Sequence, residues 1–102
     1  MKPSDLIEMG WCRVSRAHNK DGKPCDAVSP YAVAWCPLGA IEVFYGSGTP
    51  IFYNAVSRLL GEKEQPRSSE AHLAQAFHVA LWADHPARQK EEILAQMRQV
   101  GL

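Results

Sequence analysis

Three cysteines and a histidine lie in the first third of the chain, and their side chains are of the kinds that hold metal ions. They are Cys12, His18, Cys25 and Cys36. Structural zinc sites draw such ligands from close pairs like Cys-x-x-Cys, because one tight turn then presents two sulfurs to the same ion. No pair of that spacing occurs in this sequence. We therefore predict no metal site and no cofactor, and only the tertiary structure decides whether these four side chains approach one another.

A histidine, a tryptophan and an aspartate form a second candidate site, near the end of a predicted helix. His78 and Trp82 stand at positions i and i+4, so they share one helix face, and Asp84 follows them closely. An imidazole and an indole on one face can stack on a small ligand, or they can simply pack against the protein. His72 points about 120° away from His78 on a straight helix, so the two cannot share one metal ion. We keep His78, Trp82 and Asp84 as a candidate ligand-binding site.

No residue pattern in the chain indicates catalysis. A nucleophilic Cys or Ser needs a base that a third group orients, and no local signature such as Gly-x-Ser-x-Gly is present. The acidic pair Glu91-Glu92 falls in the first turn of a predicted helix, where acids interact favourably with the helix dipole. The loop at 46–49 precedes a helix whose free amides could hold an anion, but it lacks the lysine and spacing of a P-loop. A non-enzymatic role is therefore favoured.

The segment between Trp11 and Cys25 is rich in cations, while many of the acids that balance them lie elsewhere in the chain. A basic protrusion of this kind can dock on an acidic protein surface or on phosphate groups. The alternative is a solvated loop without a partner. The candidate partner-binding residues are Arg13, Arg16, His18, Lys20 and Lys23.

Composition limits the range of functions. A chain of 102 residues suits one domain, 1–102, and 46% hydrophobic residues is enough for a packed core. A formal net charge of zero argues against a nucleic-acid binder and a polybasic membrane anchor, and it makes a protein partner or a homo-oligomer easier to form. The odd number of cysteines and the polar start predict reduced thiols in the cytoplasm.

The elements that position these residues are mainly helical. A short helix is expected from Pro3 to Gly10, with Gly10 as a left-handed stop. Asp21-Gly22 predicts a tight turn, so Arg13–Ala17 and Lys23–Cys25 are expected to flank a small hairpin. Ser29 is expected to cap a central, buried helix from Tyr31 to Tyr45, which Pro37 kinks or divides.

Three further helices are expected after the central one. One starts at Thr49-Pro50, with an apolar stripe of Ile51, Phe52, Ala55, Val56, Leu59 and Leu60. After a polar linker at 62–68, the next helix runs from Ser69 to Ala83 and turns Leu73, Phe77, Ala80 and Leu81 to the core. The last begins near His85 and buries Ile93, Leu94, Met97 and Val100. The predicted fold is mainly all-α, a compact bundle of about five helices with a short loop or β-hairpin after the first.

Several short motifs occur in a recognisable order, namely Gly10-Trp11, Asp21-Gly22, Ala34-Trp35-Cys36 with Gly39-Ala40, and Trp82 to Pro86 with Glu92-Ile93. This set resembles a family of small bacterial and phage-encoded proteins catalogued as a domain of unknown function. The resemblance runs from about Gly10 to Val100. Two positions depart from the pattern: Pro37 replaces a helix-friendly apolar residue, and Ala83 replaces an expected Asn.

The resemblance implies a small accessory protein and carries no activity. We therefore expect a non-enzymatic macromolecular interaction protein, in a phage or mobile-element setting. The alternative is a small-ligand-binding protein with a pocket near His78 and Trp82.

Overall fold

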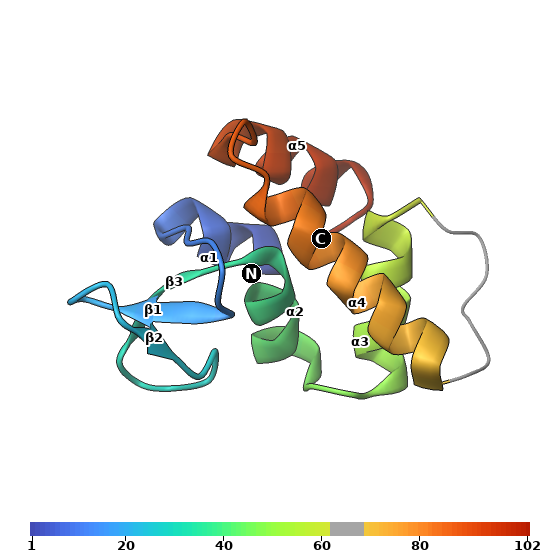
Figure 1. The fold of residues 1–102 in the computed structure, drawn as a ribbon, viewed down its shortest axis with the longest axis horizontal. Coiled ribbons are helices and arrows are strands. Elements are labelled where there is room, and N and C mark those ends of the chain that lie inside the picture. The colour runs from blue at the N-terminus through green and yellow to red at the C-terminus, as the bar shows by residue number, and fades with distance from the viewer. Residues whose placement is uncertain (62–68) are drawn as a thin grey trace.

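The computed structural model describes residues 1–61 and 69–102, with side chains described for residues 1–61 and 75–102. This part of the chain forms five helices and three short strands: α1 (Pro3–Met9), β1 (Ala17–Asn19), β2 (Pro24–Cys25), β3 (Ala32–Trp35), α2 (Pro37–Tyr45), α3 (Pro50–Leu59), α4 (Ser69–Asp84) and α5 (Lys90–Gln99). The strands form one antiparallel sheet in the order β2-β1-β3. The sheet lies at one end of the molecule beside α1, and α2 to α5 fill the rest (Figure 1). Five helices were expected, but the sheet gives the fold a mixed α/β character.

Helix α1 ends at Gly10 as predicted, although the reason differs from the expected one. Gly10 is extended, with φ −170°, and is not in the left-handed region. Its lack of a side chain matters because a Cβ there would lie 2.1 Å from the carbonyl oxygen of Val33. Gly10 therefore lets the end of α1 touch the backbone of β3.

The predicted hairpin is confirmed around Asp21-Gly22, but its first strand is Ala17–Asn19 and overlaps the expected Arg13–Ala17 only at Ala17. The side-chain oxygen of Asn19 accepts hydrogen bonds from the backbone N–H groups of Asp21 and Lys23, at 3.0 and 3.1 Å. Gly22 has φ +76°, which a tight turn of this kind needs. The first strand starts only at Ala17, because residues 13–16 bend to meet other parts of the molecule.

The segment predicted as one central helix from Tyr31 to Tyr45 is in fact a strand followed by a helix. The interruption at Pro37 is confirmed, since Pro37 is the first residue of α2 and Cys36 caps the helix. The helix expected before it is wrong: residues 32–35 form β3 and pair with β1. Ser29 does not cap a helix but closes a turn, accepting a hydrogen bond from the N–H of Tyr31.

Helix α3 begins as predicted, because the hydroxyl of Thr49 accepts from the N–H of Phe52 at 3.1 Å and Pro50 follows at the first position. Ile51 was expected in the core but is exposed. In α5, the predicted Ile93 and Met97 are fully buried, although the helix begins at Lys90 and later than expected. The linker predicted at 62–68 lies outside the described residues.

Helix α4 turns a different face to the core from the one predicted. Val79 and Ala83 are buried, and the hydroxyl of Ser57 donates to the buried side chain of Gln75 at 3.0 Å. Phe77 and Leu81, which were expected in the core, are 63% and 56% exposed. The apolar residues of α4 lie on both of its faces, so the sequence pattern could not identify the covered one.

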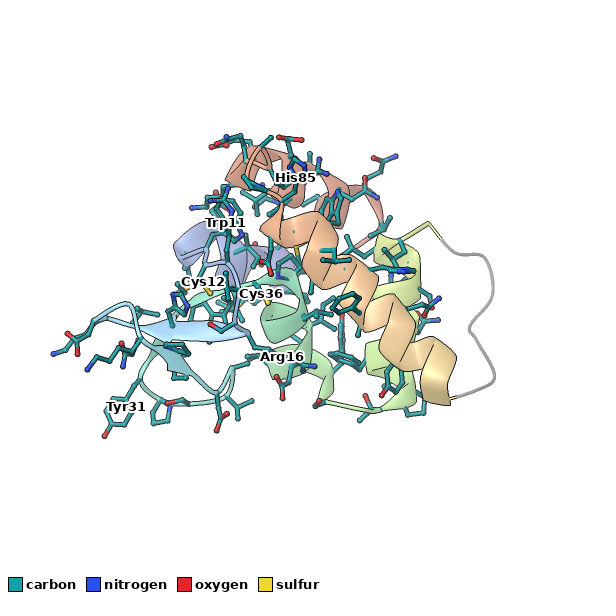
Figure 2. The ribbon with its side chains drawn as sticks, viewed as in Figure 1. Trp11, Cys12, Arg16, Tyr31, Cys36 and His85 are labelled. Atoms are coloured by element: carbon teal, nitrogen blue, oxygen red, sulfur yellow. The ribbon has the colours of Figure 1, made fainter. Side chains whose placement is uncertain are left out.

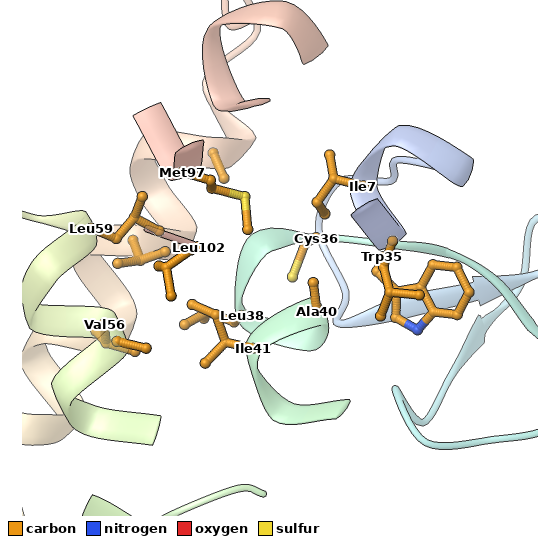
Figure 3. Close-up of a cluster of buried hydrophobic side chains, with 14 of the residues drawn as sticks. Ile7, Trp35, Cys36, Leu38, Ala40, Ile41, Val56, Leu59, Met97 and Leu102 are labelled. Atoms are coloured by element: carbon orange, nitrogen blue, oxygen red, sulfur yellow. The ribbon is translucent and has the colours of Figure 1, made fainter. Parts of the chain in front are cut away.

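One hydrophobic core joins the five helices. Ile7 of α1, Ile41 of α2, Val56 of α3, Val79 of α4 and Met97 of α5 are all fully buried in it. Figure 3 shows α2 at the centre, with side chains from α1, α3 and α5 converging on it. No helix among the described residues is long and apolar enough to cross a membrane.

Candidate functional site

The basic segment predicted to bind a partner is divided into two parts by the structure. The guanidinium of Arg13 lies 4.3 Å from the ring centre of Trp11 and donates to the backbone carbonyl of Arg88. Arg16 forms an ion pair with Glu42 at 3.1 Å. These two arginines therefore bind other parts of their own chain.

The remaining candidates, His18, Lys20 and Lys23, stay together on the hairpin. His18 is half-buried in β1, and both lysines are exposed near the turn. Beside them lies an open groove of about 300 Å³, the hairpin groove, lined by Asn19, Lys20, Asp21, Pro30, Tyr31 and Val33. Tyr31 is 76% exposed, and Figure 2 shows it projecting from the sheet end of the molecule. The sequence drew attention to the lysines, but not to the apolar side chains next to them.

A second groove, of about 220 Å³, lies where the loop before β1 meets α2 and α4. We call it the Cys36 groove, and it is lined by Val14, Ser15, Arg16, Cys36, Leu38, Ala80 and Asp84. The carboxylate of Asp84 accepts a hydrogen bond from the N–H of Val14 at 3.0 Å. Val14 has φ +78°, which is costly for a β-branched residue. The contact with Asp84 thus holds a strained loop at the rim of this groove.

The Cys36 thiol lies at the start of α2, where its sulfur accepts from the N–H of Gly39 at 3.4 Å. Burial raises the pKa of Cys36, although the backbone N–H groups of Gly39 and Leu38 act in the opposite direction. Cys12 lies near the start of the loop before β1, and its thiol donates to the carbonyl of Ser15. Burial, followed by the electrostatic effect of Cys36, raises the pKa of Cys12 to about 12. Both thiols are therefore protonated near neutral pH, which makes them poor nucleophiles.

The three residues of the predicted ligand site do not share one cavity. Asp84 lines the Cys36 groove, whereas Trp82 lines a separate groove of about 300 Å³ with Leu59, Leu60 and Gln96. His78 is exposed and lines neither. Trp82 is half-buried, and the guanidinium of Arg88 lies 5.1 Å from its ring centre. The side chain of His72 lies outside the described residues.

Two further features considered from the sequence have local structural roles. Thr49 caps the helix after the glycine-containing loop, and its hydroxyl also donates to the carbonyl of Tyr45 at 2.7 Å. Glu92 accepts from the N–H of Gln89 and pairs with Arg88, and these contacts lower its pKa. Among the described side chains, no three from His, Cys, Asp and Glu are placed to hold a metal ion.

The comparison with protein families covers nearly the whole chain. Residues 4–101 match the model of a family of unknown function, DUF6197. The chain belongs to this family. No curated protein and no solved structure matches it. Membership of DUF6197 thus names no activity for the chain.

Several of the residues that first suggested such a family lie around the Cys36 groove in this DUF6197 member, whereas Asp21 lines the hairpin groove and Trp82 lines the third groove. Gly10 touches β3, Cys36 and Asp84 line the Cys36 groove, and Gly39 lies against the carbonyl of Arg16 on the same loop. A Cβ on Gly39 would lie only 1.9 Å from that oxygen. Sequence reasoning missed this convergence because each motif is short and the contacts join distant segments. Asp84 belongs to the Trp-x-Asp-x-Pro pattern, and this pattern was the sequence feature that could have pointed to the Cys36 groove.

Proposed function

We propose that the protein is a non-enzymatic accessory protein that binds another macromolecule through the hairpin groove. The observation that supports this is the exposure of Tyr31 and Val33 beside Lys20 in one groove. Tyrosine is enriched among the residues that dominate binding energy at protein interfaces. The groove combines apolar side chains with the opposite charges of Lys20 and Asp21, and this suits a protein segment that carries an apolar side chain beside polar or charged groups.

Of the five residues first chosen for partner binding, His18, Lys20 and Lys23 belong to this proposal. Arg13 and Arg16 do not, since Arg13 stacks on Trp11 and Arg16 pairs with Glu42. The bound macromolecule is a different protein or a second copy of this chain, because a formal net charge of zero opposes neither.

Photo-crosslinking in cells of the organism that encodes the protein tests this proposal. A photoreactive residue replaces Tyr31 in one variant, and in the control it replaces Asn54, which is exposed on α3. We expect a defined adduct from position 31 only, and its mass distinguishes a second copy from another protein. Replacing Lys20 and Lys23 together with Glu should remove the adduct. Equal labelling from both positions, or none from position 31, would contradict the proposal.

Binding of a small ligand is a second candidate function, favoured by the lining of the Cys36 groove. Arg16 and Asp84 bring opposite charges to this groove, and Val14, Leu38 and Ala80 supply apolar walls. Pockets for small molecules commonly combine apolar walls with a few polar groups. Asp84, one of the residues first chosen for a ligand site, would contribute the negative charge, while His78 and Trp82 lie outside this groove.

Native mass spectrometry of protein purified from its own organism tests the second candidate. A retained small mass that Asp84→Asn removes would support it, because the amide keeps the hydrogen bond to Val14 but loses the charge. Asn54→Asp is a control that alters charge at an exposed site on α3. A ligand-free protein, or a mass retained equally by Asp84→Asn, would argue against this function.

A cytoplasmic location and a phage or mobile-element setting belong to the same proposal. All three cysteines are unpaired, which is typical of proteins from reducing compartments. The resemblance carried by the ordered short motifs supports the phage setting. Cell fractionation checks the location, and recovery of the protein in a membrane or secreted fraction would contradict it.

A further inference from the structure

The start of the loop after α1 runs parallel to the end of β3, and this brings two cysteines into register. The N–H of Trp35 donates to the carbonyl of Gly10 at 2.9 Å, and the N–H of Cys12 donates to the carbonyl of Trp35 at 3.2 Å. These two bonds define a parallel bridge between Trp11 and Trp35. The next pair in the same register is Cys12 and Cys36.

Strand geometry determines how these two side chains are directed. Successive side chains of an extended segment alternate between the two faces, so Cys12 and Cys36 share the face opposite to Trp11 and Trp35. Neighbouring strands lie about 4.8 Å apart. A disulfide needs α-carbons about 4.4–6.8 Å apart with their Cβ atoms directed alike. Continued by one residue, the register of this bridge would place Cys12 and Cys36 at the backbone separation that a disulfide needs.

The third cysteine is excluded from this pair by its place in the sheet. Cys25 pairs with Ala17 across β1 and β2, and Ala17 also pairs with Trp35 across β1 and β3. Residues of one such row point to the same face, so Cys25 shares the face of Trp35. It therefore lies on the face opposite to Cys12 and Cys36.

We propose that Cys12 and Cys36 form a reversible disulfide when the protein meets a small disulfide oxidant such as oxidised glutathione. One protein thiol loses its proton to solvent and attacks the oxidant, forming a mixed disulfide and releasing one small thiolate. The second protein thiol, deprotonated in turn, attacks the protein-side sulfur and releases the other small thiolate. Two electrons pass from the cysteines to the oxidant, which is reduced to two thiols.

We expect this reaction to be slow in the folded protein, because both sulfur atoms are buried and make other contacts. Both cysteines are buried, and the Cys12 thiol donates to the carbonyl of Ser15 while the Cys36 sulfur accepts from Gly39. Burial also raises the pKa of both thiols, and the thiolate is the reacting form. Oxidation therefore needs a transient outward movement of the loop that holds Cys12, and its rate should rise with pH.

The bond would connect two walls of the Cys36 groove. Val14, Ser15 and Arg16 follow Cys12 directly in the loop, and Cys36 is itself part of the lining. Closing the bond ties this loop to the start of α2 and turns the Cys36 sulfur from Gly39 toward Cys12. Figure 2 shows the two cysteines beside each other where α1, the sheet and α2 meet.

The test uses the full-length native protein and oxidised glutathione at mildly alkaline pH, followed by alkylation of the remaining thiols. We expect a loss of about 2 Da in the folded protein, a crosslinked peptide joining Cys12 to Cys36, and alkylation or glutathionylation at Cys25 only. Reduction should reverse the change. Cys25→Ser should still form the bond, whereas Cys12→Ser and Cys36→Ser should not.

Two results would overturn the proposal. One is a disulfide that contains Cys25 in the folded wild-type protein. The other is full alkylation of Cys12 and Cys36 in Cys25→Ser after the same oxidation. One result comes from the wild-type protein and the other from Cys25→Ser, and both proteins keep the two buried thiols, so loss of folding in the Cys12 or Cys36 variants does not affect the test.

Discussion

Gly39 stands where the loop before β1 crosses the first turn of α2. A Cβ at this position would lie 1.9 Å from the carbonyl oxygen of Arg16 and 2.8 Å from its carbonyl carbon. These are backbone atoms, so the overlap cannot be relieved by turning a side chain. We predict that Gly39→Ala lowers the free energy of unfolding by about 2–4 kcal/mol, measured by urea denaturation.

Gly22→Ala is the matched control for that prediction. Gly22 has φ +76°, but a Cβ at this position would have no neighbouring atom within 4 Å, so only the backbone preference is lost. We expect a cost of about 1–2 kcal/mol. If the two substitutions cost the same, the close approach of the loop to α2 would be wrong.

The buried thiol of Cys12 should make stability depend on alkaline pH. Its pKa is raised to about 12, above the 9.0 of an unperturbed thiol. The folded protein then retains a proton that the unfolded chain releases, so this contribution is complete below about pH 8.5 and is lost as pH rises toward 12. The expected fall is up to about 1.4 kcal/mol per pH unit for this thiol.

Urea denaturation of the reduced protein at several pH values measures this effect. Cys12→Ser should reduce the slope of stability against pH above about pH 8.5. Cys25→Ser is the control, because Cys25 is only half-buried. An unchanged slope in Cys12→Ser would show that Cys12 is not protected in the folded state.

At the scale of elements, α4 provides a direct comparison between its two faces. Val79 is fully buried, while Leu81 is 56% exposed on the same helix. We predict that Val79→Ala lowers the free energy of unfolding by about 2 kcal/mol, because it leaves a cavity in the core. Leu81→Ala should change it by less than about 0.5 kcal/mol. The reverse order in thermal or urea denaturation would mean that the sequence-based assignment of the inner face was right.

The element that sequence reasoning misassigned is β3. Ala32, Val33, Ala34 and Trp35 continue an apolar run into α2, and such a run is compatible with a buried helix or a strand. The outcome depends on remote partners. The N–H of Trp35 bonds to Gly10, and that of Cys36 bonds to Arg16, so the backbone of this segment is satisfied as a strand.

At the scale of the whole molecule, Arg88 connects the last two helices to the N-terminal loop. Its side chain donates to the carbonyl of Trp82 at 3.2 Å and pairs with Glu92 at 2.9 Å, while its own carbonyl accepts from Arg13. We predict that Arg88→Ala lowers the free energy of unfolding by about 1–2 kcal/mol, since a cation–π contact and a part-buried hydrogen bond are lost.

Arg98→Ala is the matched control, because Arg98 pairs with Glu8 between α5 and α1 on the exposed surface. Ion pairs of this kind contribute about 0–1 kcal/mol. Thermal denaturation of both variants measures the difference. A larger loss of stability in Arg98→Ala than in Arg88→Ala would contradict the prediction that the contacts of Arg88 contribute more to the fold.

The candidate sites also depended on the whole molecule. The cluster of cations in the sequence indicated one basic surface, but ion pairing and stacking withdraw Arg13 and Arg16 from it. Lys20, which remains exposed on the hairpin, lies in one groove with Tyr31. A pattern of charged residues in the sequence cannot identify a tyrosine. Charge along a sequence says nothing about which charges the same chain neutralises.

Features that depend on a few neighbouring residues could be predicted correctly from the amino-acid sequence. Thr49-Pro50 starts α3, Asp21-Gly22 turns the hairpin, and Pro37 interrupts the apolar segment, because caps, turns and proline act through local sterics and short hydrogen bonds. Three other features became evident in the folded molecule: residues 32–35 form a strand, α4 covers the core with Val79 and not with Phe77, and Trp11, next to Cys12, is bridged to Trp35, next to Cys36. Those outcomes depend on hydrogen-bond partners and packing surfaces that are distant in the chain.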